Sequence, residues 1–185
     1  MRHIVLNAIA AAALTGLAAC TSTYENRETA GIASSSIRLD PGRSILIAVP
    51  ADGQFGSRSY GGTGRVVAQK TAAAFSRYAP KVEISGTGST NREALLATAR
   101  NAQAGYLIVP TIAHWEQRAT EWSGIPARVT IDMAIVDVEK GTELRSGLLE
   151  SRSAVMTLVR PNPEALAERL VDNYVASLYG APANP

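Results

Sequence analysis

Residues that build disulfides and metal centres are scarce in this chain. It has one cysteine, Cys20, and two histidines, His3 and His114. One cysteine cannot form an intramolecular disulfide, and outside the N-terminal segment there is neither a Cys/His pair nor a second histidine for a zinc site or an activated thiol. The Gly-x-Ser-x-Gly motif of serine hydrolases is missing as well. We therefore predict no metal, no cofactor and no identifiable catalytic residue.

An excess of charge of one sign is also missing. The chain has 18 lysine and arginine residues against 16 aspartate and glutamate residues, a formal net charge of +2. No basic block stands out along the chain. This balance provides no electrostatic basis for binding nucleic acid, so we expect no nucleic-acid partner.

Long apolar runs are limited to the N-terminus. After Arg2, the run from Ile4 to Ala19 is apolar or small except for Asn7 and Thr15. It is shorter than the roughly 18–20 apolar residues that a membrane-spanning helix needs. A positively charged start, a short apolar centre and small residues at the end are typical of a secretory signal peptide, which we predict over residues 1–19.

The predicted signal peptide ends in Leu17-Ala18-Ala19-Cys20, which resembles the lipobox of bacterial lipoproteins. In those proteins a diacylglyceryl group is attached to the cysteine thiol, the signal peptidase cuts before the cysteine, and the freed amine is acylated. We predict this lipid attachment at Cys20, and each buried CH₂ group then contributes about 0.8 kcal/mol to anchoring. The alternative is an ordinary secretory signal with an incidental cysteine.

The residue after the cysteine bears on the membrane to which the protein is sorted. In enteric-type bacteria an aspartate at this position resembles a signal for retention in the inner membrane. Here the position holds Thr21. We therefore expect the outer membrane, with the domain facing the periplasm, and regard the inner membrane as the less favoured location.

The remaining residues are predicted to form one domain on a tether. Residues 20–43 begin with the lipidated cysteine and are polar and rich in Ser and Thr, so we expect a flexible tether. Residues 44–180 are long enough for a single α/β domain with one core. Residues 181–185 are expected to form a loose tail.

The order of the predicted elements indicates the topology of this domain. Strand and helix patterns alternate as strand, helix, strand, helix, strand, which favours parallel pairing. An antiparallel β meander and a C-terminal helix follow. The fold class is α/β, in an α+β variant, with one mixed sheet packed by helices. The predicted strands are 45–49, 81–85, 106–112, 128–138 and 143–153, and the first two helices are 65–78 and 90–103.

Local signals predict the ends of two helices. The stretch from Thr90 to Glu93 has the pattern of a capping box, with Thr90 as the N-cap, and Gly105 is the expected C-cap of the same helix. Asn162, followed by Pro163 and an acidic residue, predicts the N-terminus of the last helix.

A glycine-rich loop from Asp52 to Gly64 joins the first predicted strand to the first helix. Free amides at such a helix start can bind phosphate, and nearby arginines add positive charge. The loop lacks the lysine of a P-loop, and Val67 stands where a dinucleotide-binding motif has its third glycine. A long flexible connection is therefore the favoured interpretation. The residues of the weaker, anion-binding hypothesis are Arg58, Gly62, Gly64 and Arg65.

The densest group of chemically specific side chains lies between residues 114 and 122, which include both tryptophans of the chain. In a strand, His114 and Glu116 share one face as an acid/base pair, and Trp115 lies on the other. Aromatic and charged side chains at a strand end are also common in protein interfaces. A third interpretation is a purely structural hairpin arm. The candidate partner-binding or ligand-binding residues are His114, Trp115, Glu116, Arg118, Glu121 and Trp122.

Four motifs occur together in this chain. They are the lipobox, Val49-Pro50-Ala51-Asp52-Gly53 with Tyr60-Gly61-Gly62-Thr63-Gly64, the stretch from Val109-Pro110 through His114-Trp115-Glu116 to Gly124, and Val136-Asp137-Val138 before Gly141. In these motifs the chain resembles a family of Gram-negative bacterial lipoproteins classified as a domain of unknown function. The resemblance covers nearly all of the mature part and implies no activity.

The order of elements is similar, more distantly, to that of two envelope proteins. These are the curli-secretion lipoprotein and the N-terminal α/β domain of the Tol-system propeller protein, whose domains act in assembly and partner binding. This likeness depends on topology alone and is an analogy.

Together these observations favour a membrane-anchored periplasmic lipoprotein that acts as a non-catalytic binding or envelope-assembly module, with an envelope protein as its partner. This hypothesis requires the segment from Trp115 to Trp122 to lie on an exposed surface. The alternative is an envelope enzyme, a hydrolase or small-ligand-binding protein, that uses His114 and Glu116. That hypothesis requires the two side chains to converge in a cleft.

Overall fold

The computed structural model describes residues 23–30, 37–86, 89–117, 126–153 and 162–182, with residues 23–30 described by their backbone. The strands are β1 (Thr23–Ala30), β2 (Ile45–Ile47), β3 (Gln54–Phe55), β4 (Arg58–Ser59), β5 (Val82–Ile84), β6 (Tyr106–Glu116), β7 (Arg128–Asp137) and β8 (Thr142–Arg152). The helices are α2 (Thr63–Phe75), α3 (Arg92–Asn101) and α4 (Pro163–Leu178).

A mixed sheet of six strands forms the centre of the domain, in the order β1-β8-β7-β6-β2-β5. β2 is parallel to both β5 and β6, whereas β6, β7, β8 and β1 pair with one another antiparallel. The alternating strands and helices form the parallel part and the meander forms the antiparallel part. The predicted α/β class, with one mixed sheet packed by helices, is confirmed. β3 and β4 form a separate two-stranded hairpin.

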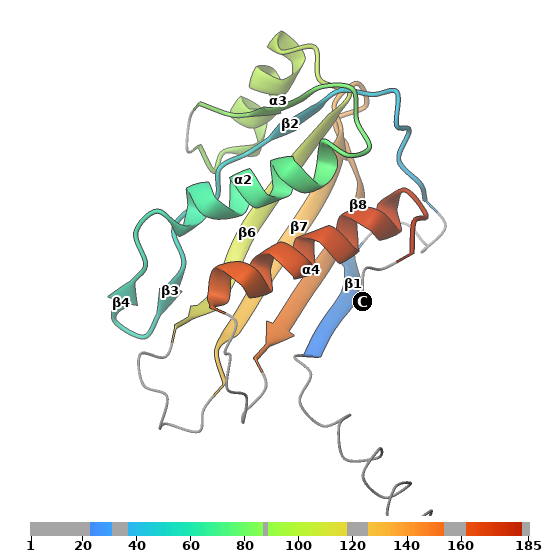
Figure 1. The fold of residues 1–185 in the computed structure, drawn as a ribbon. Helices are drawn as coiled ribbons and strands as arrows, with labels where there is room; N and C mark the ends of the chain where they lie inside the picture. The colour runs from blue at the N-terminus through green and yellow to red at the C-terminus, as the bar shows by residue number, and fades with distance from the viewer. Residues whose placement is uncertain (1–22, 31–36, 87–88, 118–125, 154–161, 183–185) are drawn as a thin grey trace, which may run out of the picture.

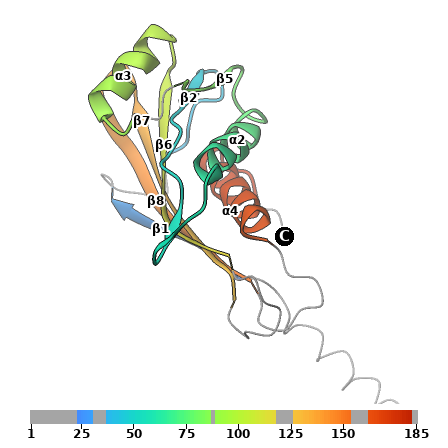
Figure 2. The same cartoon turned by 90° about the vertical axis from the view of Figure 1, so that its left-hand side faces the viewer.

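The helices cover the two faces of the sheet unequally (Figures 1 and 2). α2 and α4 lie side by side over one face, and α3 lies on the opposite face near one end of the sheet. A large apolar core fills the space beneath α2 and α4, and a smaller core lies beneath α3. Ile45 and Ile47 belong to the large core and Leu46 to the small one. β2 is therefore buried on both faces, which explains its unbroken apolar run.

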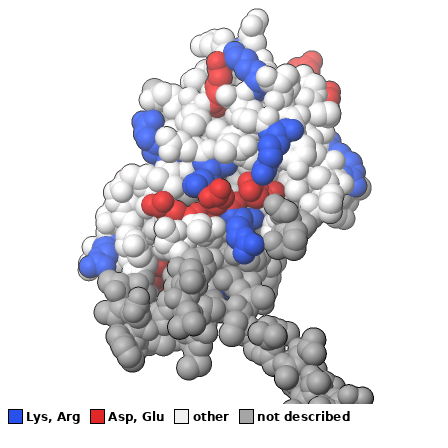
Figure 3. Space-filling model, viewed as in Figure 1, with Lys and Arg blue, Asp and Glu red and all other residues white. Residues whose placement is uncertain are grey.

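Ion pairs join the two helices above the large core. Lys70 Nζ of α2 lies 2.7 Å from Glu168 Oε2 of α4, and Arg77 bonds to Asp172. Figure 3 shows a row of acidic side chains on this face of the molecule, with basic side chains on either side. The pairs are partly exposed, so each contributes about 0–1 kcal/mol. None of the described helices is long and apolar enough to cross a membrane.

The side chains of β7 alternate between the two faces of the sheet. Val129, Ile131, Met133 and Ile135 lie in the large core, and Val136 lies in the small core. Successive residues of a strand point to opposite faces, so the even-numbered residues of β7 mark the side that carries α3. We call this side of the sheet the α3 side. The residues of β6 and β8 that face them in register belong to it as well.

A β-bulge at Ala113 decides which residues of β6 are buried. The register skips this residue between Ile112 and His114. Because the bulge shifts the alternation by one, Ile112 and Trp115 both pack against the large core although they are three positions apart. His114 and Glu116 consequently point to the α3 side.

The ends of two helices test the predicted caps. The N-terminus of α4 is as predicted: Pro163 is its first residue and Asn162 Oδ1 accepts a 2.8 Å hydrogen bond from the Ala165 amide. At α3 the predicted cap Thr90 is wrong, because Asn91 Oδ1 accepts from the amides of the second and third helical residues. Asparagine and threonine are both common N-cap residues, and here the N-cap is Asn91, directly before the first helical residue.

The predicted C-cap Gly105 of α3 is also wrong. The helix stops earlier, with Ala102 as its C-cap, and Gln103 takes the left-handed conformation with φ 55°. Gly105 instead donates to the Ser44 carbonyl at the start of β6 and packs against Arg43, where an added Cβ would lie 2.6 Å from the arginine Nε. This glycine therefore serves close packing rather than helix termination.

β1 lies within the segment for which we predicted a flexible tether. Thr23–Ala30 pairs antiparallel with β8 over its whole length. Leu39 is buried in the large core, and its amide donates to the Leu178 carbonyl at the end of α4. An edge strand obtains its hydrogen bonds from its neighbour, whatever the polarity of its side chains, and a polar composition therefore concealed it. Ordered structure thus begins N-terminal to residue 44.

Candidate functional site

Two of the predicted site residues come together at the end of β6. His114 Nε2 lies 3.2 Å from Glu116 Oε2. The histidine side chain is 25% exposed and the glutamate side chain 8%. Phe55 of the β3–β4 hairpin packs edge-on against the imidazole, with ring centroids 5.1 Å apart. The two titratable groups are within hydrogen-bonding distance, as an acid/base pair requires.

Trp115 takes no part in this surface. Its side chain is 1% exposed and packs in the large core. Gly53 lies so close to it that an added Cβ would be 2.5 Å from the Trp115 Cβ. A ring buried to this extent cannot touch a partner while the domain is folded. The assignment of Trp115 as a partner-binding residue is therefore corrected, and the bulge at Ala113 is the reason.

Other predicted residues lie outside the described part of the chain. These are Arg118, Glu121 and Trp122, which follow β6, and the lipid-attachment residue Cys20 with the signal peptide before it. Their roles stay predictions.

A charged network lies beside the His114–Glu116 pair on the α3 side. Arg128 Nη2 of β7 lies 3.0 Å from Glu150 Oε2 of β8, and Arg152 Nη2 lies 2.7 Å from Glu150 Oε1. Burial raises the pKa of Glu150, but hydrogen bonds from Arg152 and Arg128 outweigh burial and hold this pKa below its ordinary value. The carboxylate is therefore charged at neutral pH.

The register of the strands shows how these groups are arranged. Glu116, Arg128 and Arg152 lie in one cross-strand row, and His114, Thr130 and Glu150 lie in the next row. α3 packs beyond these rows, over Leu107 and Val136, so its ribbon covers the other end of this side (Figure 2). We call the part that none of the described helices covers the polar face. Its polar residues include Thr111, His114, Glu116, Arg128, Thr130, Glu150 and Arg152.

The glycine-rich loop already holds a carboxylate at the start of α2. Asp52 Oδ2 accepts a 3.0 Å hydrogen bond from the Gly62 amide, and Asp52 Oδ1 accepts a 2.8 Å bond from the Gly64 amide. Under the anion-binding hypothesis these two amides would bind an external anion. The carboxylate of Asp52 accepts their hydrogen bonds instead. Arg58 on β4 and Arg65 in the first turn of α2 are exposed. This geometry argues for a structural role of the loop.

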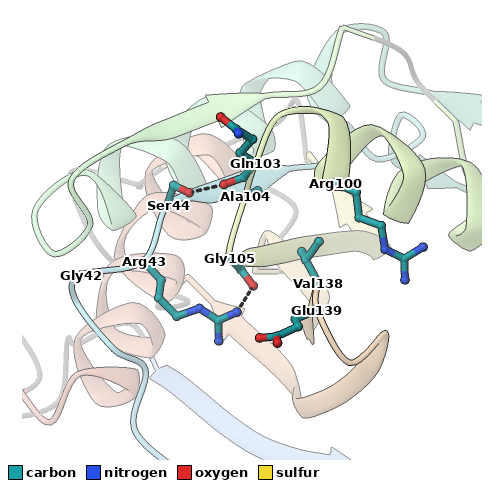
Figure 4. A pocket seen from close by; sticks show the side chains of 9 residues that line it. All are labelled: Gly42, Arg43, Ser44, Arg100, Gln103, Ala104, Gly105, Val138 and Glu139. Carbon is teal, nitrogen blue, oxygen red and sulfur yellow. Dashed lines mark hydrogen bonds between the residues drawn. The ribbon is translucent and has the colours of Figure 1, made fainter.

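A pocket of about 530 Å³ lies at the other end of the sheet, at the amino ends of β2 and β6 (Figure 4). Its lining residues are Gly42, Arg43, Ser44, Arg100, Gln103, Ala104, Gly105, Val138 and Glu139. Ligands of open α/β sheets usually bind at the opposite, carboxyl ends of the parallel strands. No local pattern in the sequence indicated this pocket.

Arg43 in this pocket is held by other groups of the protein. Its Nη1 donates to Asp137 Oδ2 at 2.9 Å, its Nη2 donates to the Gly105 carbonyl at 2.7 Å, and its guanidinium lies 4.2 Å from the centre of the Tyr106 ring. Asp137 Oδ1 also accepts from the Lys140 amide in the β7–β8 turn. The arrangement joins the segment before β2 to the β7–β8 turn. Within the described residues, no group of three or more His, Asp or Glu side chains could hold a metal ion.

A family model for a domain of unknown function, DUF4823, matches residues 37–178. The chain belongs to this family. The match confirms the resemblance to a domain-of-unknown-function family and spans β2 to α4, including the pocket and the polar face. No curated protein matches the sequence of the chain.

Several solved structures resemble this DUF4823 domain. The PelC dodecamer from Paraburkholderia phytofirmans has a TM-score of 0.62 and 15% identity, over 87% of this chain and 99% of that chain. Lipoprotein GNA1162 from Neisseria meningitidis has a TM-score of 0.44 and 20% identity, over 60% and 83% of the two chains. TolB from Acinetobacter baumannii has a TM-score of 0.40 and 15% identity, over 88% and 32%. PelC shares the fold.

The Arg43–Asp137 pair predicts a pH-dependent contribution to the stability of the DUF4823 domain. A hydrogen bond from Arg43 holds the pKa of Asp137 below its ordinary value, against the opposing effect of burial. The stabilisation is therefore present at neutral pH and is lost as the pH falls below about 4, through the lowered pKa of the folded state. We expect Asp137→Asn to lower the free energy of unfolding by about 1.5–3 kcal/mol at pH 7, and by much less near pH 3.

The measurement is urea unfolding of unlipidated residues 20–185 carrying Cys20→Ala, at both pH values. Asp132→Asn is the matched control, because burial and the nearby Glu143 raise the pKa of Asp132. Folding disfavours the charged form of Asp132, so Asp132→Asn is expected to stabilise the domain at pH 7. Equal losses in the two variants at pH 7 would contradict the assignment.

Proposed function

We propose that this chain is a lipid-anchored lipoprotein of the cell envelope, held on the outer membrane through Cys20, whose periplasmic domain binds an envelope protein without catalysing a reaction. The signal peptide and lipobox pattern support the anchor. The polar face of the sheet supports the binding role, and it is the observation on which this role depends.

Three properties make the polar face suitable for binding a protein. It lies on one regular sheet, so its side chains are held on a rigid support. It presents polar side chains that a partner can reach, namely Thr111, which is exposed, and His114, whose side chain is 25% exposed. It also combines both signs of charge with hydroxyl and imidazole groups, which favours a polar partner surface of complementary charge.

The alternative, an envelope enzyme, is favoured by the 3.2 Å contact between His114 and Glu116. Two observations make it the weaker candidate. The described pocket begins at Gly105, nine positions before His114 on β6, which is about 30 Å along a strand. Thr130 faces His114 in register but is 5% exposed, so a substrate cannot reach its hydroxyl.

The likeness to PelC is compatible with an assembly role. The solved PelC structure is a dodecamer, and its chain has the same fold over most of the length of this one. A domain of this architecture can therefore serve in a protein assembly. For the present chain we propose a protein partner at the polar face.

Site-specific crosslinking in intact cells tests this proposal. A photoreactive benzoylphenylalanine at Thr111, which is exposed on the polar face, is expected to yield a discrete adduct with one envelope protein. The matched control is the same residue at Ala73, which is exposed on α2 on the opposite side of the sheet. Mass spectrometry would identify the adduct. Identical adducts at both positions, or capture of bulk lipoproteins and porins alone, would count against a binding role for the polar face.

A further inference from the structure

The distance between the predicted lipid anchor and the first strand is short. Cys20 stands three positions before Thr23, where β1 begins. A fully extended chain advances about 3.3–3.6 Å per residue, so the Cα atoms of these two residues are at most about 11 Å apart. The lipid therefore enters the membrane close to the start of β1.

The sheet register shows what else lies at this end of the domain. Thr23 pairs with Arg152 of β8, Arg152 pairs with Arg128 of β7, and Arg128 pairs with Glu116 of β6. We call this end of the sheet, defined by the row Thr23–Arg152–Arg128–Glu116, the basal end. In Figure 1 it is the lower end, opposite α3.

We propose that the basal end rests on the lipid headgroups of the membrane that holds the anchor, with Arg128 and Arg152 contacting headgroup phosphates and the α3 end pointing away. The proposal depends on the lipid anchor of the proposed function and adds the orientation of the domain and the surface that touches the bilayer. β7 has ten residues, which span about 30 Å. The inverted orientation would place Thr23 about that far from the membrane, well beyond the 11 Å that the linking residues can cover.

The chemistry of the two arginines suits phosphate. They share one carboxylate, Glu150, so these three groups together carry a charge of +1. The carboxylate of Glu116, which ends the same row, is 8% exposed and lies against His114. A guanidinium has five N–H donors, and among the described residues Glu150 takes one from Arg128 and two from Arg152. Donors therefore remain on both side chains for bidentate bonds to a headgroup phosphate.

The β3–β4 hairpin lies at the same end of the domain. Phe55 packs on His114, and Gly53 lies against Trp115, so the hairpin is level with the last residues of β6. Among the described residues Phe55 is the large hydrophobic side chain left exposed, at 37%, and Arg58 follows it on β4. An exposed aromatic ring beside arginines is typical of surfaces that lie in the headgroup region.

Fluorescence quenching in vesicles tests the orientation. The lipidated mature protein would carry one labelled cysteine, at Ser57 in the hairpin turn or at Glu139 in the β7–β8 turn, two exposed positions at opposite ends of the sheet. Cys20 is the sole cysteine of the chain, and lipid attachment consumes its thiol, so the introduced cysteine alone takes the label. The vesicles contain phosphatidylethanolamine and phosphatidylglycerol with a spin label on the headgroup.

We expect several-fold stronger quenching of the label at Ser57→Cys than of the label at Glu139→Cys. Equal quenching at both positions, or stronger quenching at Glu139→Cys, in vesicle-bound protein would overturn the orientation and leave the anchor intact. A lipid-processed sample that does not sediment with vesicles would instead overturn the anchor, and the proposed function with it. The same two variants carrying Cys20→Ala show the signal expected of unanchored protein.

The role of the arginines has a separate readout. In the Ser57→Cys background, replacing Arg128 and Arg152 together by glutamine is expected to weaken quenching. Replacing both by lysine is expected to give an intermediate value, because the positive charge remains and the bidentate geometry is lost. Added salt should weaken quenching in the arginine protein more than in the glutamine variant. Quenching that is unchanged in the glutamine variant, with circular dichroism confirming its fold, would overturn the headgroup contact.

Discussion

Replacing Cys20 with alanine, in a chain whose residues 1–19 are exchanged for a conventional cleavable signal peptide, is expected to release the mature protein from the membrane into the periplasmic fraction. The lipids predicted on this residue are the main source of membrane affinity: each buried CH₂ group contributes about 0.8 kcal/mol, and two or more acyl chains give stable anchoring. The contact proposed for Arg128 and Arg152 is much weaker, at about 1 kcal/mol per residue near an anionic surface. The arginines can orient the domain but cannot hold it in place.

Cell fractionation with immunoblotting checks this prediction, with loss of lipid confirmed by the mass of the N-terminal peptide. Thr21→Asp is the matched control. It leaves the cysteine intact, so the protein should stay membrane-bound, and in an enteric-type host it should move from the outer to the inner membrane. If the Cys20→Ala protein remained in the membrane fraction after a high-salt wash, the anchor would lie elsewhere.

Trp115→Ala is expected to lower the free energy of unfolding by about 3–5 kcal/mol. The ring is 1% exposed and packs in the large core, so its removal leaves a cavity that the surrounding sheet and helices cannot fill. In a domain of this size each kcal/mol corresponds to roughly 2–4 °C in melting temperature. A loss of this size also reduces the amount of folded protein in the cell, which would lower any binding signal indirectly.

His114→Ala is the matched control for this substitution. The two residues are adjacent on β6, but the histidine side chain is 25% exposed and lies on the polar face, so we expect a loss below about 1 kcal/mol. Chemical denaturation of both variants, combined with the crosslinking at Thr111, separates stability from binding. If Trp115→Ala lowered the free energy of unfolding only slightly and His114→Ala lowered it strongly, the bulge at Ala113 would be wrong, and so would the assignment of Trp115 to the core and His114 to the polar face.

The two proposals together describe how the domain presents its binding surface. With the basal end on the headgroups, the strands extend from the membrane surface into the periplasm, and the polar face forms one side of the domain that is open to the periplasm. Thr111 then lies higher above the bilayer than Arg128 and Arg152. A partner in the same membrane could thus reach Thr111 and His114 while the arginines at the basal end remain near the lipid.

The order of strands and helices could be predicted from the sequence because it depends on local patterns. The predicted strands 45–49 and 128–138 correspond to β2 (Ile45–Ile47) and β7 (Arg128–Asp137). Asn162 before Pro163 marked the start of α4. Each of these signals acts between residues a few positions apart, where periodicity and capping chemistry operate.

The candidate site could be predicted only in part. The His114–Glu116 pair was identified because residues two positions apart in a strand share a face. Trp115 was assigned to the surface wrongly, since one bulged residue reverses inside and outside for the rest of a strand. No local feature of the sequence identifies Ala113 as the bulged residue. The Arg43–Asp137 pair was missed because its partners lie 94 positions apart and neither has an unusual local context.

The sequence by itself determined the signal and lipobox pattern and the α/β class, since these follow from side-chain polarity and its period along the chain, whereas the division of the expected single core into two appeared only in the structure. The tertiary structure alone decided that Thr23–Ala30 is a sheet edge, that Asp52 caps α2, and that Arg128 and Arg152 share Glu150 at the end nearest Cys20. These features depend on hydrogen bonds and ion pairs between distant segments. Such bonds have no local period, and they exist only once the strands have paired.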